Sequence, residues 1–269
     1  MKKIMVAVAP VSHYVKGSKL DPVEIAEEVI ACAEAGASMV HLHVRDEYGN
    51  QCYDLTHFSK TLDIIRAKSD IVIQGSTGGV CDLSLEDRCV SVTEPRVQLA
   101  SLNMGSTNAD EGLYTNTLPD IRFWAKECEK YGVLPEFEVF DTGMVNNVKL
   151  LAKEGFFKHA PHSYNICLGF VGCTPAEPEY LLGIQRCLPP DAHWGVSVHH
   201  MKNLQMHALA LGLGADFIRV GFEDGTTIYN EGFVSNLDQV KAAVELVRLS
   251  GNEVATPADV REILNITKA

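Results

Sequence analysis

The sequence predicts a (β/α)₈ TIM barrel, the α/β fold in which eight parallel strands alternate with eight helices. Eight short runs are rich in apolar and β-branched residues, helix-period segments separate them, and the spacing fits one strand and one helix per unit. Eight such units most simply close into a barrel, and a doubly wound open sheet is the alternative. The runs lie at residues 4–9, 38–44, 71–74, 97–102, 134–140, 164–168, 193–198 and 217–221.

The first helix has the clearest boundary signals. Asp21 is expected to cap it, Pro22 suits its first position, and Gly36 follows its last apolar residues. The helix signals near Leu85 and Glu179 are less distinct. Further helices are expected after Thr56, Leu118, Gly143, Lys202 and Val234.

The length and composition are typical of a globular protein with one large domain. Its 269 residues are 46% hydrophobic and carry no linker-like segment, so residues 1–269 are expected to form one domain. A net charge of −12 argues against nucleic-acid or acidic-membrane partners, which bind through basic patches. The N-terminal apolar run is too short for a signal peptide, and eight cysteines without a C-x-x-C pair predict thiols in a reducing cytoplasm.

Two histidines stand at the end of the second strand. His41 and His43 are two residues apart, so both imidazoles point to the same face of the strand. Active sites of this fold lie at the C-terminal strand ends, and paired imidazoles suit zinc and other borderline divalent metals. Hydrogen bonding of both rings to carbonyl groups or water is the alternative.

The last strand carries a third metal-ligand candidate. Arg219 and Glu223 share a face by the two-residue period, and Glu223 at the strand end can complete a His₂Glu site with an open position. Arg219 would lie one layer deeper and needs a carboxylate partner, either Asp224 or an inward glutamate. A structural ion pair that caps the barrel is the alternative.

The fifth strand carries two carboxylates. Glu136 and Glu138 fall on one face, where they can hold Arg219 or orient a metal-bound histidine. Alternatively, one of them faces solvent.

Polar and small residues follow the third and fourth strands. The segment 75–79, Gly-Ser-Thr-Gly-Gly, offers backbone N–H groups and hydroxyls to an anion such as a carboxylate, although a plain tight turn also explains it. Ser101 and Asn103 add two polar groups on one face of the fourth strand. Histidines 13, 199 and 200 lie in loops, where solvated histidines are the more common case.

Five strand-end motifs occur together and in order. The chain resembles the β-keto acid cleavage enzymes, from its first strand to the Ala-Thr-Pro segment at 255–257. The resemblance rests on H-L-H-V-R-D at 41–46, S-T-G-G at 76–79, S-L-N-M-G at 101–105, P-E-F-E-V-F-D at 135–141 and R-V-G-F-E-D at 219–224.

The resemblance implies a zinc-dependent barrel, a homotetramer, that converts a β-keto acid and acetyl-CoA into acetoacetate and a new acyl-CoA. By motif, the implied zinc ligands are His41, His43 and Glu223. The implied substrate-binding residues are Ser76, Gly79 and Ser101, with Asn103 as a further candidate. Arg219 and Asp224 match the pair assigned to substrate deprotonation, and Glu138 matches a supporting acidic position.

One departure from the family bears on the substrate. Family members that act on an amino-keto acid have a glutamate in the loop after the first strand, where this chain has His13. A neutral, hydroxyl or anionic substrate tail is then at least as compatible as a cationic one, because imidazole can donate, accept or carry positive charge. Two other functions stay open: a CoA-independent zinc lyase or aldolase, and a metal-stabilised carboxylate-binding protein.

Overall fold

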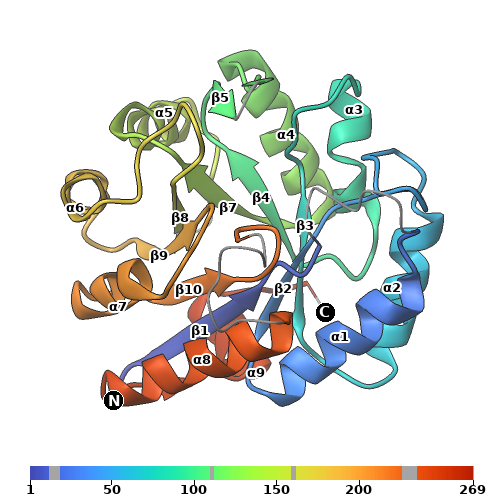
Figure 1. Cartoon of the computed structure of the whole chain (residues 1–269). Helices are drawn as coiled ribbons and strands as arrows, with labels where there is room; N and C mark the ends of the chain where they lie inside the picture. Colours follow the sequence, from blue (N-terminus) through green and yellow to red (C-terminus); the bar gives the residue numbers. More distant parts are fainter. Residues whose placement is uncertain (12–18, 110–111, 159–161, 226–234, 269) are drawn as a thin grey trace.

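The computed structural model is a closed barrel of parallel strands surrounded by helices (Figure 1). It describes residues 1–11, 19–109, 112–158, 162–225 and 235–268. Each barrel strand pairs in parallel with the next, and the first pairs with the last. The predicted TIM barrel is therefore confirmed, and the open-sheet alternative is wrong. In chain order the strands are β1 (Lys3–Val8), β2 (Met39–Leu42), β3 (Val72–Ser76), β4 (Leu99–Asn103), β7 (Leu134–Val139), β8 (Ser163–Leu168), β9 (His193–Val198) and β10 (Phe217–Val220).

Helices surround the barrel and follow the expected signals. The Asp21 carboxylate accepts a hydrogen bond from the Val23 backbone N–H at 2.8 Å, which caps the first helix. No helix in the described part of the chain has both the length and the apolar character needed to cross a membrane. The helices are α1 (Pro22–Glu34), α2 (Thr56–Arg66), α3 (Leu85–Arg88), the 3₁₀ helix η1 (Val90–Thr93), α4 (Leu118–Tyr131), α5 (Thr142–Lys153), α6 (Pro178–Gln185), α7 (Gln205–Gly212), α8 (Asn236–Leu249) and α9 (Pro257–Ile263).

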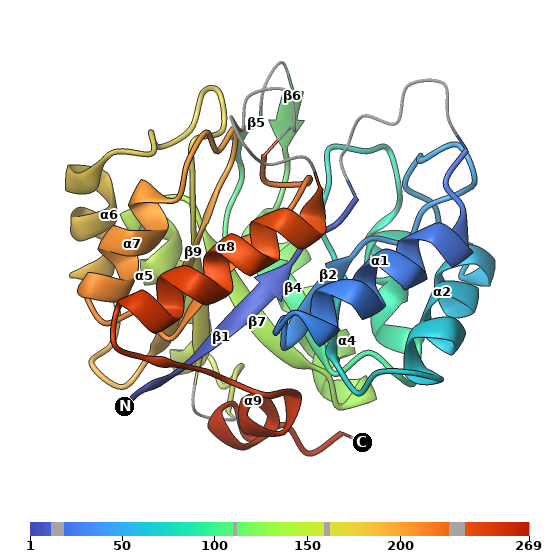
Figure 2. The same ribbon diagram turned by 60° about the horizontal axis from the view of Figure 1, so that its bottom comes forward.

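Several short elements were not expected from the sequence. Strands β5 (Thr107–Ala109) and β6 (Gly112–Tyr114) form an antiparallel hairpin at one end of the barrel, and α9 lies at the opposite end (Figure 2). Strand β11 (Glu253–Val254) adds to β1. These elements span two to seven residues. Such lengths are too short for a hydrophobic period to be read.

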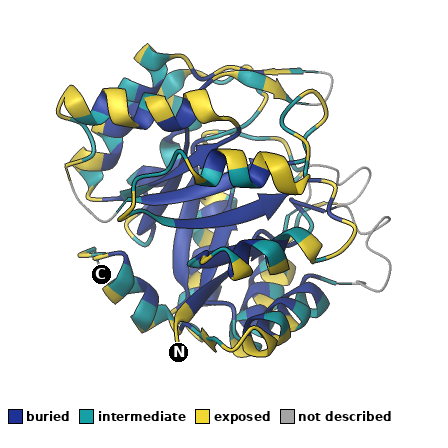
Figure 3. Ribbon diagram, turned by 90° about the vertical axis from the view of Figure 1, so that its left-hand side faces the viewer, coloured by how far each residue is buried: buried dark blue, intermediate teal, exposed yellow. Residues whose placement is uncertain are grey.

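The barrel interior divides into an apolar lower part and a polar upper part. The barrel strands are buried except at the first residues of β1, β7 and β9 (Figure 3). Near the N-terminal strand ends, Met5, Val72, Leu99 and Phe217 form an apolar cluster that α9 covers with residues including Val260. A larger cluster lies between the strands and the surrounding helices. The apolar lower part leaves the upper, C-terminal end for the polar side chains.

Candidate active site

A cavity of about 690 Å³ opens at the C-terminal ends of the barrel strands. Strands from around the barrel contribute to its wall, as do the loop after β2 and the β5–β6 hairpin. This is the end of the barrel at which active sites of the fold are built. The wall includes His41, His43, Ser76, Gly79, Glu138, Arg219 and Glu223, all of which the sequence had indicated.

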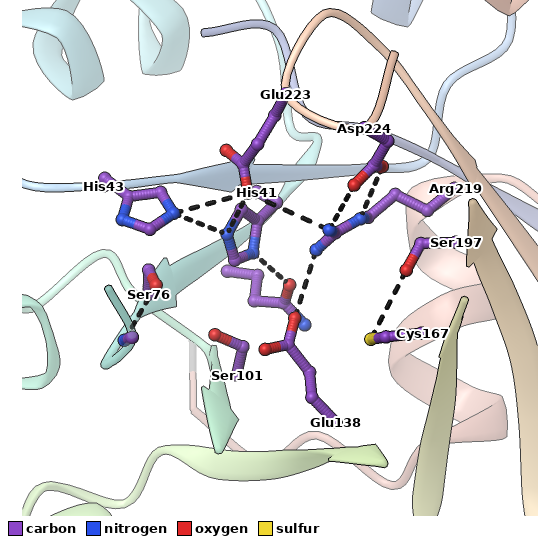
Figure 4. Close-up of polar contacts among 12 residues, drawn as sticks. His41, His43, Ser76, Ser101, Glu138, Cys167, Ser197, Arg219, Glu223 and Asp224 are labelled. Atoms are coloured by element: carbon purple, nitrogen blue, oxygen red, sulfur yellow. Dashed lines mark hydrogen bonds and ion pairs between the residues drawn. The ribbon is translucent and has the colours of Figure 1, made fainter. Parts of the chain in front are cut away.

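Two imidazoles and one carboxylate converge at this cavity (Figure 4). His41 Nε2 lies 3.3 Å from His43 Nε2, and Glu223 Oε1 lies 3.2 Å and 3.3 Å from these two nitrogens. The side chains of His41, His43 and Glu223 expose only 2%, 7% and 6% of their surfaces. Three potential ligand atoms therefore form a nearly equilateral, buried triangle.

The triangle has the dimensions of one face of a tetrahedral metal site. Zinc binds nitrogen and oxygen ligands at about 2.0–2.1 Å, so tetrahedral ligand atoms lie about 3.3–3.4 Å apart. The observed separations of 3.2–3.3 Å fit that value. A His₂Glu set also suits catalysis, because it leaves one position for a substrate or water.

Two of the three groups in the triangle are shifted toward the form that binds a cation. Burial acts to lower the pKa of His41, but the Glu223 carboxylate outweighs it and raises that pKa. At His43 burial dominates and lowers the pKa to about 3. Burial opposes the charge of Glu223, yet the two imidazoles hold the pKa of its carboxyl well below the usual range. Glu223 is therefore a carboxylate and His43 a neutral imidazole, the forms that bind metal, whereas the raised pKa of His41 favours a ring that must lose a proton when metal binds.

Arg219 is surrounded by carboxylates. Its Nε donates to Asp224 Oδ2 at 2.8 Å, its Nη2 donates to the other oxygen of Asp224, and its Nη1 donates to Glu138 Oε1 at 3.2 Å (Figure 4). Burial acts to lower the pKa of Arg219, but these carboxylates and Glu223 raise it well above its ordinary value. The sequence offered Asp224 or an inward glutamate as its partner, and Arg219 has both.

Both glutamates of β7 point into the barrel. Glu136 and Glu138 are 2% and 7% exposed, so the alternative that one of them faces solvent is wrong. Burial raises the pKa of both carboxyl groups, and Arg219 opposes this at Glu138. Ser163 Oγ donates to Glu136 at 3.3 Å, one layer below the cavity. Of the two, only Glu138 belongs to the cavity wall.

The two glycines after β3 lie close to the ends of other side chains. Gly79 has a φ of +143°, and a Cβ there would lie 2.0 Å from the Gln51 amide. A Cβ on Gly78 would lie 1.8 Å from the Tyr114 hydroxyl. The Gly78 N–H donates to Ser76 Oγ at 3.0 Å. Backbone conformation thus favours glycine at Gly79, and a side chain at either position would displace the end of Gln51 or Tyr114.

Three other predicted residues lie outside the cavity wall. Asp224, Ser101 and Asn103 are each 1% exposed and do not line the cavity. Ser101 Oγ has no hydrogen-bond partner within the described part of the chain. His13 lies outside the described residues. His199 does line the cavity, where its ring stacks on Phe170 with centroids 3.5 Å apart.

Comparison with known proteins identifies the family. The model of the beta-keto acid cleavage enzyme family matches residues 5–266, nearly the whole chain. The chain belongs to this family.

Relatives within the β-keto acid cleavage enzyme family have named activities. The chain is 35% identical over 249 residues to 3-keto-5-aminohexanoate cleavage enzyme from Fusobacterium nucleatum, covering 91% of this chain and 89% of that protein. It is 30% identical over 271 residues to 3-dehydrocarnitine:acetyl-CoA trimethylamine transferase from Rhizobium meliloti, covering 92% and 89%. The solved ternary complex of ObcA with C4-CoA adduct and oxalate has a TM-score of 0.75 at 20% identity, covering 92% of this chain and 67% of that one, which shows a shared fold.

The cleavage-enzyme site also contains residues that sequence reasoning missed. The Gln74 side chain contacts His41, the Gln51 side chain contacts His43, and Tyr114 reaches the cavity from the β5–β6 hairpin. Gln74 follows the two-residue period of β3 and directly precedes the 75–79 segment, a signal that could have placed it inside the barrel. No comparable signal marks Gln51 or Tyr114.

Proposed function

We propose that this β-keto acid cleavage enzyme transfers an acyl group from a β-keto acid to CoA, using acetyl-CoA as cosubstrate and releasing acetoacetate. Its membership of the family over residues 5–266, together with the converging His41, His43 and Glu223, is the observation that carries the proposal. The names of its relatives, which include an acetyl-CoA-dependent transferase, support the use of acetyl-CoA.

The proposed reaction breaks one carbon–carbon bond and one thioester bond, and it forms one new bond of each kind. The bond between C2 and C3 of the β-keto acid breaks, and C2 becomes bonded to the acetyl carbonyl carbon. The CoA sulfur leaves the acetyl group and bonds to C3. The C1–C2 unit then leaves as part of acetoacetate, and the rest of the substrate leaves as acyl-CoA.

The metal is proposed to be zinc, held by His41, His43 and Glu223. When bound there, zinc supplies a Lewis acid that stabilises negative charge developing on a substrate oxygen. The fit rests on the triangle of donor atoms and on their mixed nitrogen and oxygen chemistry.

Proton transfer at C2 is proposed for Asp224. Its carboxylate would take the C2 proton and later return it to acetoacetate, while Arg219 holds both of its oxygens in a fixed orientation. Glu138 is the competing carboxylate, because it lines the cavity and Asp224 does not. If Asp224 is the base, Asp224→Asn should lower kcat by at least about 100-fold and Glu138→Gln by much less. A larger loss of kcat in Glu138→Gln than in Asp224→Asn would assign the proton transfer to Glu138.

Substrate contacts are proposed for Ser76, Gly79, Ser101 and Asn103. Ser76 and Gly79 border the cavity, and the Ser101 hydroxyl has hydrogen-bonding capacity to spare. His13 is proposed to contact the substrate tail, because it lies in the sequence between β1 and α1. Its imidazole is compatible with a neutral or anionic tail, which would distinguish this chain from relatives that use a glutamate there.

The test is an assay of the purified protein with acetyl-CoA and β-keto acids that carry cationic, neutral or anionic tails. Acetoacetate formation that stops on chelation and returns with zinc is expected. Cleavage without acetyl-CoA would indicate a CoA-independent lyase instead. Metal binding without turnover of any of these β-keto acids would favour a carboxylate-binding protein.

The remaining proposals concern the molecule as a whole. We propose that residues 1–269 form one domain, that the protein assembles as a homotetramer, and that it works in a reducing cytoplasm. The last proposal is supported by its eight cysteines, whose spacing contains no C-x-x-C pair. Light scattering coupled to size-exclusion chromatography measures the assembly directly, and a mass of one or two chains would contradict a tetramer.

A further inference from the structure

Gln74 contacts His41 on the side of the ring away from the cavity triangle. Its Oε1 lies 2.6 Å from His41 Nδ1, a short hydrogen-bond distance, and its side chain is buried at 2% exposure. The two residues are direct partners in the β2–β3 ladder, so the backbone register places them side by side. Two paired strands therefore hold both ends of this contact.

The contact determines which nitrogen of His41 carries the proton. A neutral imidazole has one N–H and one lone pair. Gln74 Oε1 can only accept, so Nδ1 must be the donor, and in the neutral ring Nε2 keeps its lone pair. Nε2 is the atom that faces His43 and Glu223. The hydrogen bond thus presents the unprotonated nitrogen to the cavity before any ligand arrives.

The Gln74 amide is oriented with its oxygen toward His41, and its Nε2 has no hydrogen-bond partner within the described part of the chain. The partner of this metal-site histidine is therefore a neutral acceptor. Carboxylates and backbone carbonyls are the more common partners of metal-bound histidines.

We propose that Gln74 is a positioning residue for the metal site, which selects the Nδ1–H tautomer of His41 and thereby raises the affinity of the site for zinc. The inference rests on the metal site of the proposed function. Strand β3 thereby supports metal binding, although none of the three metal-ligand candidates lies on it.

The test measures zinc affinity by competition with a chromophoric chelator, independently of turnover. Gln74→Leu removes the acceptor and is expected to weaken zinc binding by about 10–100-fold. Gln74→Glu keeps an acceptor oxygen and should bind within about threefold of the original protein, or more tightly. Gln98→Leu is the matched control, because Gln98 is another buried glutamine (2% exposed) that bonds Lys268 and Arg261 at the far end of the barrel.

A second readout needs no metal and no variant of Gln74. Long-range ¹H–¹⁵N spectra of the metal-free protein, recorded at a pH high enough for the imidazole of His41 to be neutral and with His41 assigned by its absence in His41→Gln, should show the Nδ1–H tautomer. The Nε2–H tautomer would overturn the inference even if Gln74→Leu failed to fold.

Zinc-binding measurements distinguish failure of the role of Gln74 from failure of the proposed metal site. If the original protein binds zinc and Gln74→Leu binds it equally well, the role of Gln74 is wrong and the metal site stands. Equal weakening in Gln74→Glu and Gln74→Leu would also overturn it. If the original protein binds no zinc, the proposed metal site fails, and the inference fails with it.

Discussion

Arg219 forms ion pairs with three acidic side chains of the site. Three carboxylates, from Asp224, Glu138 and Glu223, lie within 3.8 Å of its guanidinium nitrogens. All four residues are buried. Unpaired buried carboxylates are costly, so the guanidinium stabilises this set as well as orienting Asp224.

Replacing Arg219 with lysine tests whether geometry matters beyond charge. An ammonium keeps the positive charge but cannot donate two parallel hydrogen bonds to Asp224. If Asp224 needs that orientation to act, kcat/KM should fall by about 100-fold while the circular dichroism spectrum is retained.

The control is Arg122→Lys, since Arg122 makes a similar two-bond contact with Glu154 on the outside of the barrel. Its kcat/KM should stay unchanged. An Arg219→Lys enzyme that loses less than about threefold would show that Arg219 contributes charge alone.

Several residues of the site could be predicted individually from the sequence. His41 and His43 were recognisable because they are two apart at a strand end, and Glu223 because it continues the same period beyond β10. Gln74 and Gln51 escaped notice because an amide has no metal-binding signature of its own. Their importance comes from the neighbours that strand pairing and the loop after β2 give them.

At the scale of elements, α9 closes the end of the barrel opposite the site. A capping box holds its first turn: the Asp259 N–H donates to Thr256 Oγ1 at 3.2 Å, and the Thr256 N–H donates to Asp259 Oδ2 at 2.9 Å. Asp259 also pairs with Lys3 at the start of β1. The helix is thus tied to the first strand as well as packed on the lower apolar cluster.

Thr256→Ala should destabilise the protein without affecting catalysis. Loss of an N-cap hydroxyl costs about 1 kcal/mol, which corresponds to a fall in Tm of about 2–4 °C for a chain of this size. Calorimetry measures the shift, and Thr256→Ser should restore the Tm because it retains the hydroxyl. A large loss of kcat with an unchanged Tm would contradict the separation of α9 from the active site.

At the scale of the whole molecule, acid stability should depend on Glu94. This side chain is 4% exposed and accepts hydrogen bonds from Arg96 Nε at 2.8 Å and Ser59 Oγ at 2.6 Å. Burial acts to raise its pKa, but the bonds from Arg96 and Ser59 lower the pKa of Glu94 to about 2 from an ordinary value of 4.5. Because the pKa of Glu94 is lower in the folded than in the unfolded protein, its charged carboxylate stabilises the fold. This stabilisation is complete above pH 4.5 and is lost as the pH falls toward 2.

Glu94→Gln should therefore destabilise the protein more at neutral pH than in acid. Urea unfolding at pH 7, 5 and 3 measures the difference in free energy of unfolding between the two proteins. The difference should be the same at pH 7 and 5 and smaller at pH 3. A constant difference at all three pH values would show that the carboxylate is not charged preferentially in the folded state.

Chelation should leave the barrel folded. The two apolar clusters are built from strands and helices and include none of the three metal-ligand candidates. Metal that binds only the folded state, at 100 to 1,000 times its Kd, adds about 3–4 kcal/mol. Chelation should thus lower Tm by roughly 5–15 °C. Loss of the far-ultraviolet dichroism at 25 °C on chelation would contradict a metal-independent core.

The order of strands and helices, the barrel and the principal ligand candidates were determined by the sequence alone. Hydrophobic period, capping residues and strand-end motifs act over a few residues, so they can be read without coordinates. Strand register, barrel closure and packing bring together residues distant in sequence. They decided that Gln74 faces His41, that Arg219 bridges Asp224 and Glu138, and that Asp224 stays outside the cavity wall. The contacts of Gln74 with His41 and of Arg219 with Glu138 span 33 and 81 residues along the chain, and no local pattern encodes them.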